Sequence, residues 1–245
     1  MARRGRLSVE KMGHSMPVEA TPYPAPPIYF RDAQAINIAF ETDPEAALEA
    51  LPMPLTLPEP ATAILSFLKY PWTTLGPYLE AMVLILVEYQ GRPAAYLHQI
   101  ACDSEAALLA GREIWGCPKR LASFEYCFGN GVITGRMQRD GVQIASAVFR
   151  PERPLAAEPA ESAAAIGLRV VPAIDPEAKE PFCAELIEAF PEKTVQHAWE
   201  GTGALDFGER SAFNPWSTLP VKRVVQSTLE VYDQVLGMPR GIERL

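Results

Sequence analysis

Two turn signals that lie ten residues apart constrain the fold of this chain more than any other feature. Asn130-Gly131 and Asp140-Gly141 are each flanked by residues that favour β-strands. Asn-Gly and Asp-Gly readily adopt the left-handed backbone conformations that a two-residue hairpin turn requires. We therefore expect a three-stranded antiparallel meander, with strands over residues 122–128, 132–138 and 142–149.

The rest of the chain also favours short, mostly β elements. Its 24 prolines and 16 glycines among 245 residues are scattered, which suits strands joined by turns better than a helical bundle. Asp43 and Ser104 are expected to begin short helices over residues 44–51 and from 104 to about 110, and Gly111 and Pro118 are expected to limit the second. Alternation and apolar runs predict further strands over residues 36–42, 62–70, 80–89, 94–100, 168–174, 184–190 and 194–199. Residues 220–233 form either one long strand or a strand followed by a helix.

The chain divides into an arm and one larger domain. Residues 1–27 are expected to form an extended N-terminal arm, available to pack on a neighbouring subunit, because the prolines of residues 22–27 remove backbone donors and fix φ. With 48% hydrophobic residues, the chain can bury a sizeable core, and we assign residues 28–245 to a single domain. Residues 151–165 are rich in Pro, Ala and Glu, so we expect a surface connection there.

Charge and composition exclude several functions. The formal net charge of −8 lacks the basic footprint that nucleic-acid binding needs. No apolar run is long enough to span a bilayer, and the basic residues at the start are followed by Leu7-Ser8-Val9 instead of the apolar core of a secretory signal. The four cysteines show no metal-binding spacing, so we expect a cytoplasmic protein with neither a metal nor an organic cofactor.

The segment from Gly111 to Arg120 carries the clearest candidate for chemistry. Lys119 and Arg120 follow Pro118 and a run of small and apolar residues. Such a pair is ordinarily a solvated turn. For Lys119 to attack a carbonyl carbon, its pKa must fall from about 10.4, because an amine with that pKa is almost wholly protonated at neutral pH. Burial beside Cys117 and Leu121 would disfavour the charged form.

The order Gly-Arg-Glu, four residues, Pro-Lys and a second basic residue resembles the Schiff-base segment of the acetoacetate decarboxylase family, which has Lys where this chain has Arg120. The similarity continues in Asn37-Ile38, Tyr96-Leu97-His98, His197-Ala198-Trp199 and Leu219-Pro220-Val221-Lys222. The resemblance implies an α+β, predominantly β fold with a closed, antiparallel, barrel-like core, flanking strands and a few short helices. It also implies a homo-oligomer.

The resemblance assigns roles to several residues. Lys119 would form an iminium with a keto acid, and Glu80 would transfer a proton or orient that iminium. Arg120 would tune the pKa of the lysine or hold the substrate carboxylate, unless it is only a surface cation. Further candidates for the pocket are Tyr78, Trp115 and Cys117.

Two positions depart from the family pattern. Leu65 stands at the position that matches the family's second pocket glutamate, and Ala33 at the position of its substrate-side arginine. Neither side chain can carry a charge or form an ion pair with the substrate. Arg31 would face the same side of an extended strand as Ala33, so we expect it to be available as a substitute in the pocket.

Three functions follow from these residues. The first is a Schiff-base lyase that decarboxylates acetoacetate or a related β-keto acid through Lys119. The second uses the same iminium on pyruvate or another 2-oxo acid for aldol, dehydration or hydration chemistry, which the departures at Leu65 and Ala33 favour. The third, from another class, is a non-catalytic barrel that binds a small apolar ligand.

Overall fold

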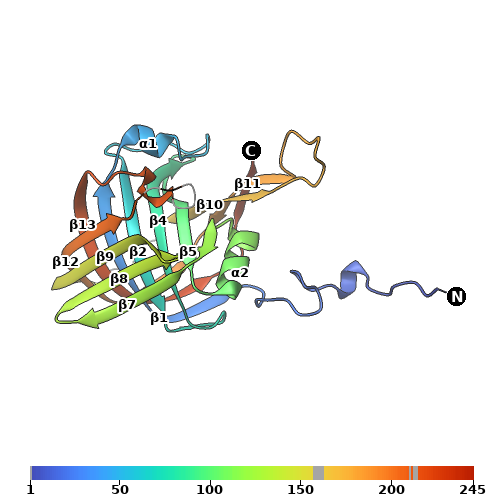
Figure 1. The fold of residues 1–245 in the computed structure, drawn as a ribbon, viewed down its shortest axis with the longest axis horizontal. Coiled ribbons are helices and arrows are strands. Elements are labelled where there is room, and N and C mark those ends of the chain that lie inside the picture. Colours follow the sequence, from blue (N-terminus) through green and yellow to red (C-terminus); the bar gives the residue numbers. More distant parts are fainter. Residues whose placement is uncertain (1, 157–162, 210, 212–214) are drawn as a thin grey trace.

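The computed structural model describes residues 2–156, 163–209, 211 and 215–245. Figure 1 shows a predominantly β body, with the N-terminal segment extending away from it. The helical elements are η1 (Val9–Lys11), α1 (Pro44–Leu48), α2 (Glu105–Trp115) and η2 (Pro215–Thr218). The strands are β1 (Ile28–Glu41), β2 (Thr62–Tyr70), β3 (Trp72–Thr73), β4 (Tyr78–Tyr89), β5 (Arg92–Cys102), β6 (Lys119–Leu121), β7 (Ser123–Gly129), β8 (Val132–Arg139), β9 (Val142–Leu155), β10 (Ala164–Val171), β11 (Cys183–Ala189), β12 (Glu192–Phe207), β13 (Arg223–Leu236) and β14 (Gly241–Arg244).

The predicted meander is confirmed. Strands β7, β8 and β9 pair in sequence as antiparallel neighbours. At the first turn Asn130 and Gly131 have φ angles of 52° and 74°, and at the second Asp140 and Gly141 have 52° and 79°. All four angles lie in the left-handed region, as the turn dipeptides predict.

The strands form one sheet that hydrogen bonds do not close into a barrel. Its order is β14-β11-β10-β5-β4-β2-β1-β13-β12-β9-β8-β7, with β3 beside β1 and β6 beside β5. Among the described residues, no pairing joins the end strands β7 and β14. The predominantly β fold with few helices is confirmed, but the closed barrel is not.

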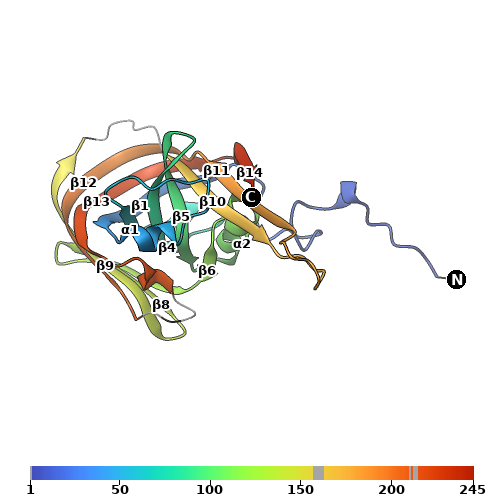
Figure 2. The ribbon, with the colours of Figure 1, turned by 90° about the horizontal axis from the view of Figure 1, so that it is seen from above.

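The open sheet curls instead of closing, as the view from above shows (Figure 2). A Cβ atom built on Gly135 of β8 would lie 2.4 Å from Cγ of Phe67 in β2. The meander therefore packs against one face of β2 through side chains, and backbone hydrogen bonds are not needed between these strands. This contact belongs to the main core, in which Phe40, Phe67 and Phe149 are fully buried.

Both predicted helices are present, but the first ends at Leu48 instead of residue 51 and the second is longer than expected. Asp43 caps α1 by accepting hydrogen bonds from the backbone of Glu45 and Ala46. Ser104 caps α2, which continues through Gly111 to Trp115. Gly116, with φ 64°, ends the helix in the left-handed conformation that favours glycine. The expected end near residue 110 was therefore wrong, because the helix stops at the second glycine and not the first.

Three further segments had been given sequence-based expectations: residues 220–233, residues 151–165 and the N-terminal arm. Residues 223–236 form the long strand β13, which pairs with β1 and β12, so the strand alternative is confirmed. The expected surface connection at 151–165 overlaps the end of β9, and residues 157–162 lie outside the described residues. In the N-terminal segment, the hydroxyl groups of Ser15 and Tyr23 donate hydrogen bonds to Glu113 on α2. No helix in the described part of the chain has the length and hydropathy needed to cross a membrane.

Candidate active site

A cavity of about 650 Å³ lies on the face of β1, β2, β4 and β13 that is opposite the main core. Alternation along the strands separates the two faces. On β2, for example, Ser66, Leu68 and Tyr70 line the cavity, whereas Leu65 and Phe67 belong to the main core. Both faces are thus covered, which explains the near-continuous burial along this strand.

Lys119 enters the cavity from the short strand β6. This strand pairs in parallel with β5, which sets Lys119 beside Ile100. A Cβ atom on Gly111 of α2 would lie 2.7 Å from Cε and 2.8 Å from Cδ of Lys119. The glycine inside the helix therefore makes room for the lysine side chain. Arg112, on the next position of α2, donates a hydrogen bond to the Lys119 carbonyl oxygen at 3.3 Å.

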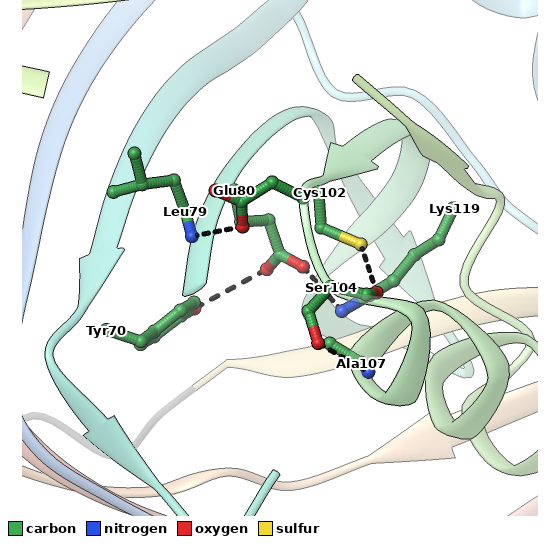
Figure 3. A network of polar contacts seen from close by, with 8 residues as sticks. Tyr70, Leu79, Glu80, Cys102, Ser104, Ala107 and Lys119 are labelled. Atoms are coloured by element: carbon green, nitrogen blue, oxygen red, sulfur yellow. Dashed lines mark hydrogen bonds and ion pairs between the residues drawn. The ribbon is translucent and has the colours of Figure 1, made fainter. Parts of the chain in front are cut away.

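Glu80 of β4 is the ionic partner of Lys119. The Nζ atom of Lys119 contacts Oε2 of Glu80, and the two side chains are only 8% and 3% exposed. The Tyr70 hydroxyl group lies 3.5 Å from the other carboxylate oxygen. Figure 3 shows the ammonium group and the tyrosine hydroxyl approaching the carboxylate from opposite sides. Nζ also lies 5.5 Å from the centre of the Tyr78 ring.

Two opposing effects set the pKa of Lys119. Burial is the largest influence and lowers this pKa, but the Glu80 carboxylate raises it, and the pKa of Lys119 lies above its ordinary value. Thiolates at Cys117 and Cys102 would raise it as well. Burial, however, raises the pKa of these two thiols to about 12 and about 11, so both are neutral at pH 7. The resting pair is therefore an ammonium group held by a carboxylate.

Three buried tyrosines surround this ion pair. Burial raises the pKa of Tyr70, Tyr78 and Tyr232, and the negative charge of Glu80 raises each of them further. A hydrogen bond with Tyr70 partly opposes the rise in the pKa of Tyr232. All three hydroxyl groups stay protonated at neutral pH, so they can donate hydrogen bonds to developing negative charge but cannot act as bases.

The structure brings several of the predicted residues together. Lys119, Glu80, Tyr78, Trp115 and Cys117 all line the cavity. The indole nitrogen of Trp115 donates a hydrogen bond to the Gly237 carbonyl oxygen at 3.0 Å, which fixes its ring in the cavity wall.

Arg120 does not join them. It is exposed and does not line the cavity, because successive residues of β6 point to opposite faces. The side chain of Arg120 therefore lies outside the cavity, and its expected role in tuning the lysine or holding the substrate carboxylate stays a prediction. Burial is the largest influence on the pKa of Lys119, and it lowers that pKa.

The pocket expected around Leu65 and Arg31 is also wrong. Leu65 is fully buried in the main core, on the other face of β2. Arg31 is exposed and pairs with Asp233 at 3.5 Å. Asp32 adopts a φ of 52°, and the register of β1 on β13 shifts between Phe30 and Ala33. This bulge breaks the period-two alternation on which the placement of Arg31 rested.

Sequence reasoning missed a second polar group in the cavity. Lys193 and Glu230 form an ion pair there, although they lie 37 positions apart in the sequence. Ser66 donates a hydrogen bond to Oδ1 of Asn37 at 2.7 Å, and the amide nitrogen of Asn37 lies 3.5 Å from Glu230. The alternation of β2 could have placed Ser66, but nothing local marks the meeting of Lys193 with Glu230.

The residues of this cavity fit amine and carboxylate chemistry. Within the described residues, no group of three or more His, Cys, Asp or Glu side chains could hold a metal ion. A buried lysine against a carboxylate, in a mostly apolar cavity with neutral tyrosines, can form an imine and move a proton beside it.

Comparisons with known proteins agree with this geometry. The family described as acetoacetate decarboxylase (ADC) matches residues 15–245. Acetoacetate decarboxylase 1 of Mesorhizobium japonicum is 30% identical over 242 residues, which cover 96% of each chain. The acetoacetate decarboxylase of Streptomyces nogalater is 31% identical over 93% of this chain and 94% of its own.

A solved structure supports the same assignment. The crystal structure of acetoacetate decarboxylase from Legionella pneumophila superposes with a TM-score of 0.88 at 27% identity, and the match covers 100% of this chain and 99% of that one. Both the sequence and the fold are thus matched over almost the whole length. The chain belongs to the acetoacetate decarboxylase family.

Proposed function

We propose that this protein is a carboxy-lyase that decarboxylates acetoacetate or a related β-keto acid through an iminium on Lys119. The observation that carries the proposal is the buried contact between Lys119 and Glu80 in a mostly apolar cavity. Family membership supports it, because relatives with closely similar lengths are named acetoacetate decarboxylases.

The first step needs a neutral amine at Lys119. In the resting pair the amine is protonated, and the proton lies between Nζ and the Glu80 carboxylate. Transfer of this proton to Glu80 leaves a neutral amine and a neutral acid, and burial favours the neutral forms of both groups. The amine then attacks the keto carbon, and loss of water from the carbinolamine gives the iminium.

The iminium makes loss of carbon dioxide favourable. The bond between the carboxylate carbon and the α-carbon breaks, and its electron pair forms a carbon–carbon double bond while the π pair of the iminium moves to nitrogen, which gives carbon dioxide and a neutral enamine. Leu68, Met82 and Ile100 supply apolar cavity wall near the ion pair. Such a wall solvates the charged carboxylate of the substrate poorly but accommodates neutral carbon dioxide, which favours loss of carbon dioxide. Glu80 gives up the proton that it took from Lys119 when the carbinolamine hydroxyl leaves as water, so it is a carboxylate again at this stage. A proton taken up from water then passes through Glu80 to the enamine carbon. Hydrolysis of the resulting iminium releases the ketone and restores Lys119.

Borohydride trapping tests this proposal. The protein is incubated with acetoacetate or, separately, pyruvate, reduced with borohydride and digested for peptide mass analysis. We expect an isopropyl adduct on Lys119 from acetoacetate, which requires both imine formation and decarboxylation. Lys119→Ala should abolish both the adduct and turnover. An adduct that keeps its carboxylate, or one that forms only with pyruvate, would favour aldol or dehydration chemistry, and turnover by Lys119→Ala would refute every Schiff-base mechanism.

Three further features belong to the same proposal. Residues 28–245 act as one domain, the chain assembles into a homo-oligomer, and the protein works in the cytoplasm. The resemblance to the family supports the oligomer, which light scattering can test. The contact of Ser15 and Tyr23 with Glu113 shows that part of the N-terminal arm packs on its own chain, which leaves residues before Ser15 for a neighbouring subunit.

A further inference from the structure

A second charged pair lies in the same cavity as Lys119 and Glu80. Lys193 of β12 pairs with Glu230 of β13, and their side chains are 25% and 26% exposed. The ammonium group of Lys193 also lies 4.0 Å from the centre of the Tyr232 ring. The mechanism above uses neither residue.

The sheet places this second pair well away from the reacting lysine. Glu80 pairs with Leu68, Leu68 with Ala35, and Ala35 with Glu230, so that one row of residues crosses four neighbouring strands. Three strand spacings of about 4.8 Å separate the two glutamates by about 14 Å along the sheet. All four residues line the cavity. The cavity therefore has a polar end at Lys119, an apolar floor of Leu68 and Ala35, and a second polar end at Glu230.

Acetoacetate cannot use this arrangement. It carries only a methyl group beyond its keto carbon, so it cannot reach from Lys119 to a residue three strands away. Its seven non-hydrogen atoms would need about 210 Å³ even if each took the volume of one liquid water, about 30 Å³. The cavity of about 650 Å³ is about three times larger.

The distal pair carries no net charge but keeps hydrogen-bonding capacity. Lys193 has three N–H donors and contacts Glu230 with one of them, and Asn37 and Lys193 leave acceptor positions on the Glu230 carboxylate. Such a group suits a neutral substituent that both donates and accepts a hydrogen bond. Glu230 would repel a second carboxylate on the ligand, and Lys193 would repel an ammonium group.

We propose that Lys193 and Glu230 form a distal specificity site for β-keto acids that carry a terminal hydroxyl or amide group beyond an apolar chain. This inference rests on the proposed function for the reaction at Lys119 and names the class of substrate. The apolar floor would hold the chain, and the ion pair would bind the terminal group.

The test compares 8-hydroxy-3-oxooctanoate with 3-oxononanoate, in which a methyl group replaces the hydroxyl. We expect the wild-type protein to prefer the hydroxy acid in kcat/KM by about tenfold or more, the effect of one hydrogen bond. The double variant Lys193→Met, Glu230→Leu should lose this preference. A matched control is Arg153→Met, Glu200→Leu, which removes a cross-strand ion pair outside the cavity and should keep it. The single variant Lys193→Met should reduce the preference as well, and it provides the test if the double variant does not fold.

A binding measurement separates this inference from the proposed reaction. Thermal shifts with the product ketones, 7-hydroxyheptan-2-one and octan-2-one, report on the distal site without turnover. Stronger stabilisation by the hydroxy ketone in the wild type and not in the double variant supports the distal site, even if neither acid is decarboxylated. Equal rates with both acids and equal shifts with both ketones would overturn the distal site and leave the decarboxylase proposal intact. A double variant that retains the full preference would overturn it too.

Discussion

Replacing Gly111 by alanine tests how the fold positions Lys119, the proposed nucleophile. The added Cβ atom would lie 2.7 Å from Cε of Lys119 and 2.8 Å from its Cδ. Carbon atoms pack at about 3.5 Å or more, so the lysine side chain must move by at least about 0.8 Å, which is 3.5 Å minus 2.7 Å. Because Cε and Cδ lie near the flexible end of the side chain, the lysine moves more easily than α2.

That displacement should reduce kcat far more than stability. A shift of about 1 Å in a reacting group can cost about 100-fold in rate, so we expect kcat for acetoacetate to fall by about that factor. Alanine favours a helix over glycine by about 1 kcal/mol, which offsets local crowding, and the melting temperature should stay close to that of the wild type. Carbon dioxide release measures the rate, and calorimetry measures the melting temperature.

A matched control and a clear refutation complete this experiment. Gly129 lies in β7 with no atom within 4 Å of an added Cβ, so Gly129→Ala should leave both quantities unchanged. If folded Gly111→Ala kept kcat within about threefold of the wild type, the close approach of α2 to Lys119 would not position the nucleophile. If it unfolded, the crowding would have fallen on the helix and not on the lysine.

Three other predictions follow from the structure. In Glu80→Gln the pKa of Lys119 should fall, because the carboxylate no longer opposes the effect of burial. The pH profile for labelling of Lys119 by an amine-reactive ester should therefore move to lower pH, and an unchanged profile would contradict this prediction. Gly135→Ala should lower the free energy of unfolding in urea by about 1–3 kcal/mol, since its Cβ would lie 2.4 Å from Phe67, and equal stability would argue against this packing. Burial lowers the pKa of His98 to about 4, below its ordinary 6.5. The free energy of unfolding should therefore fall by up to about 3 kcal/mol as the pH drops from about 6.5 to about 4, because the unfolded chain takes up the proton first. His98→Asn should reduce that loss, and an equal loss in both proteins would refute a buried neutral His98.

Local sequence patterns predicted most of the helices and strands, and they singled out Lys119 as the candidate nucleophile. Asn130-Gly131 and Asp140-Gly141 specified two hairpin turns, and the apolar run of residues 62–70 matches the bounds of β2. These features depend on backbone preferences and side-chain alternation over a few neighbouring residues, which the chain carries wherever it folds. The order of motifs around Lys119 identified the family in the same way.

Which side chains meet depends on long-range strand pairing. Leu65 was expected in the pocket, but the pairing of β2 turns it to the main core, and the bulge at Asp32 turns Arg31 to solvent. A register shift of one residue reverses the face of every side chain, and distant pairing sets that register. The same long-range pairing joins Lys193 to Glu230 and leaves the sheet open, because both depend on strands that are far apart in the chain.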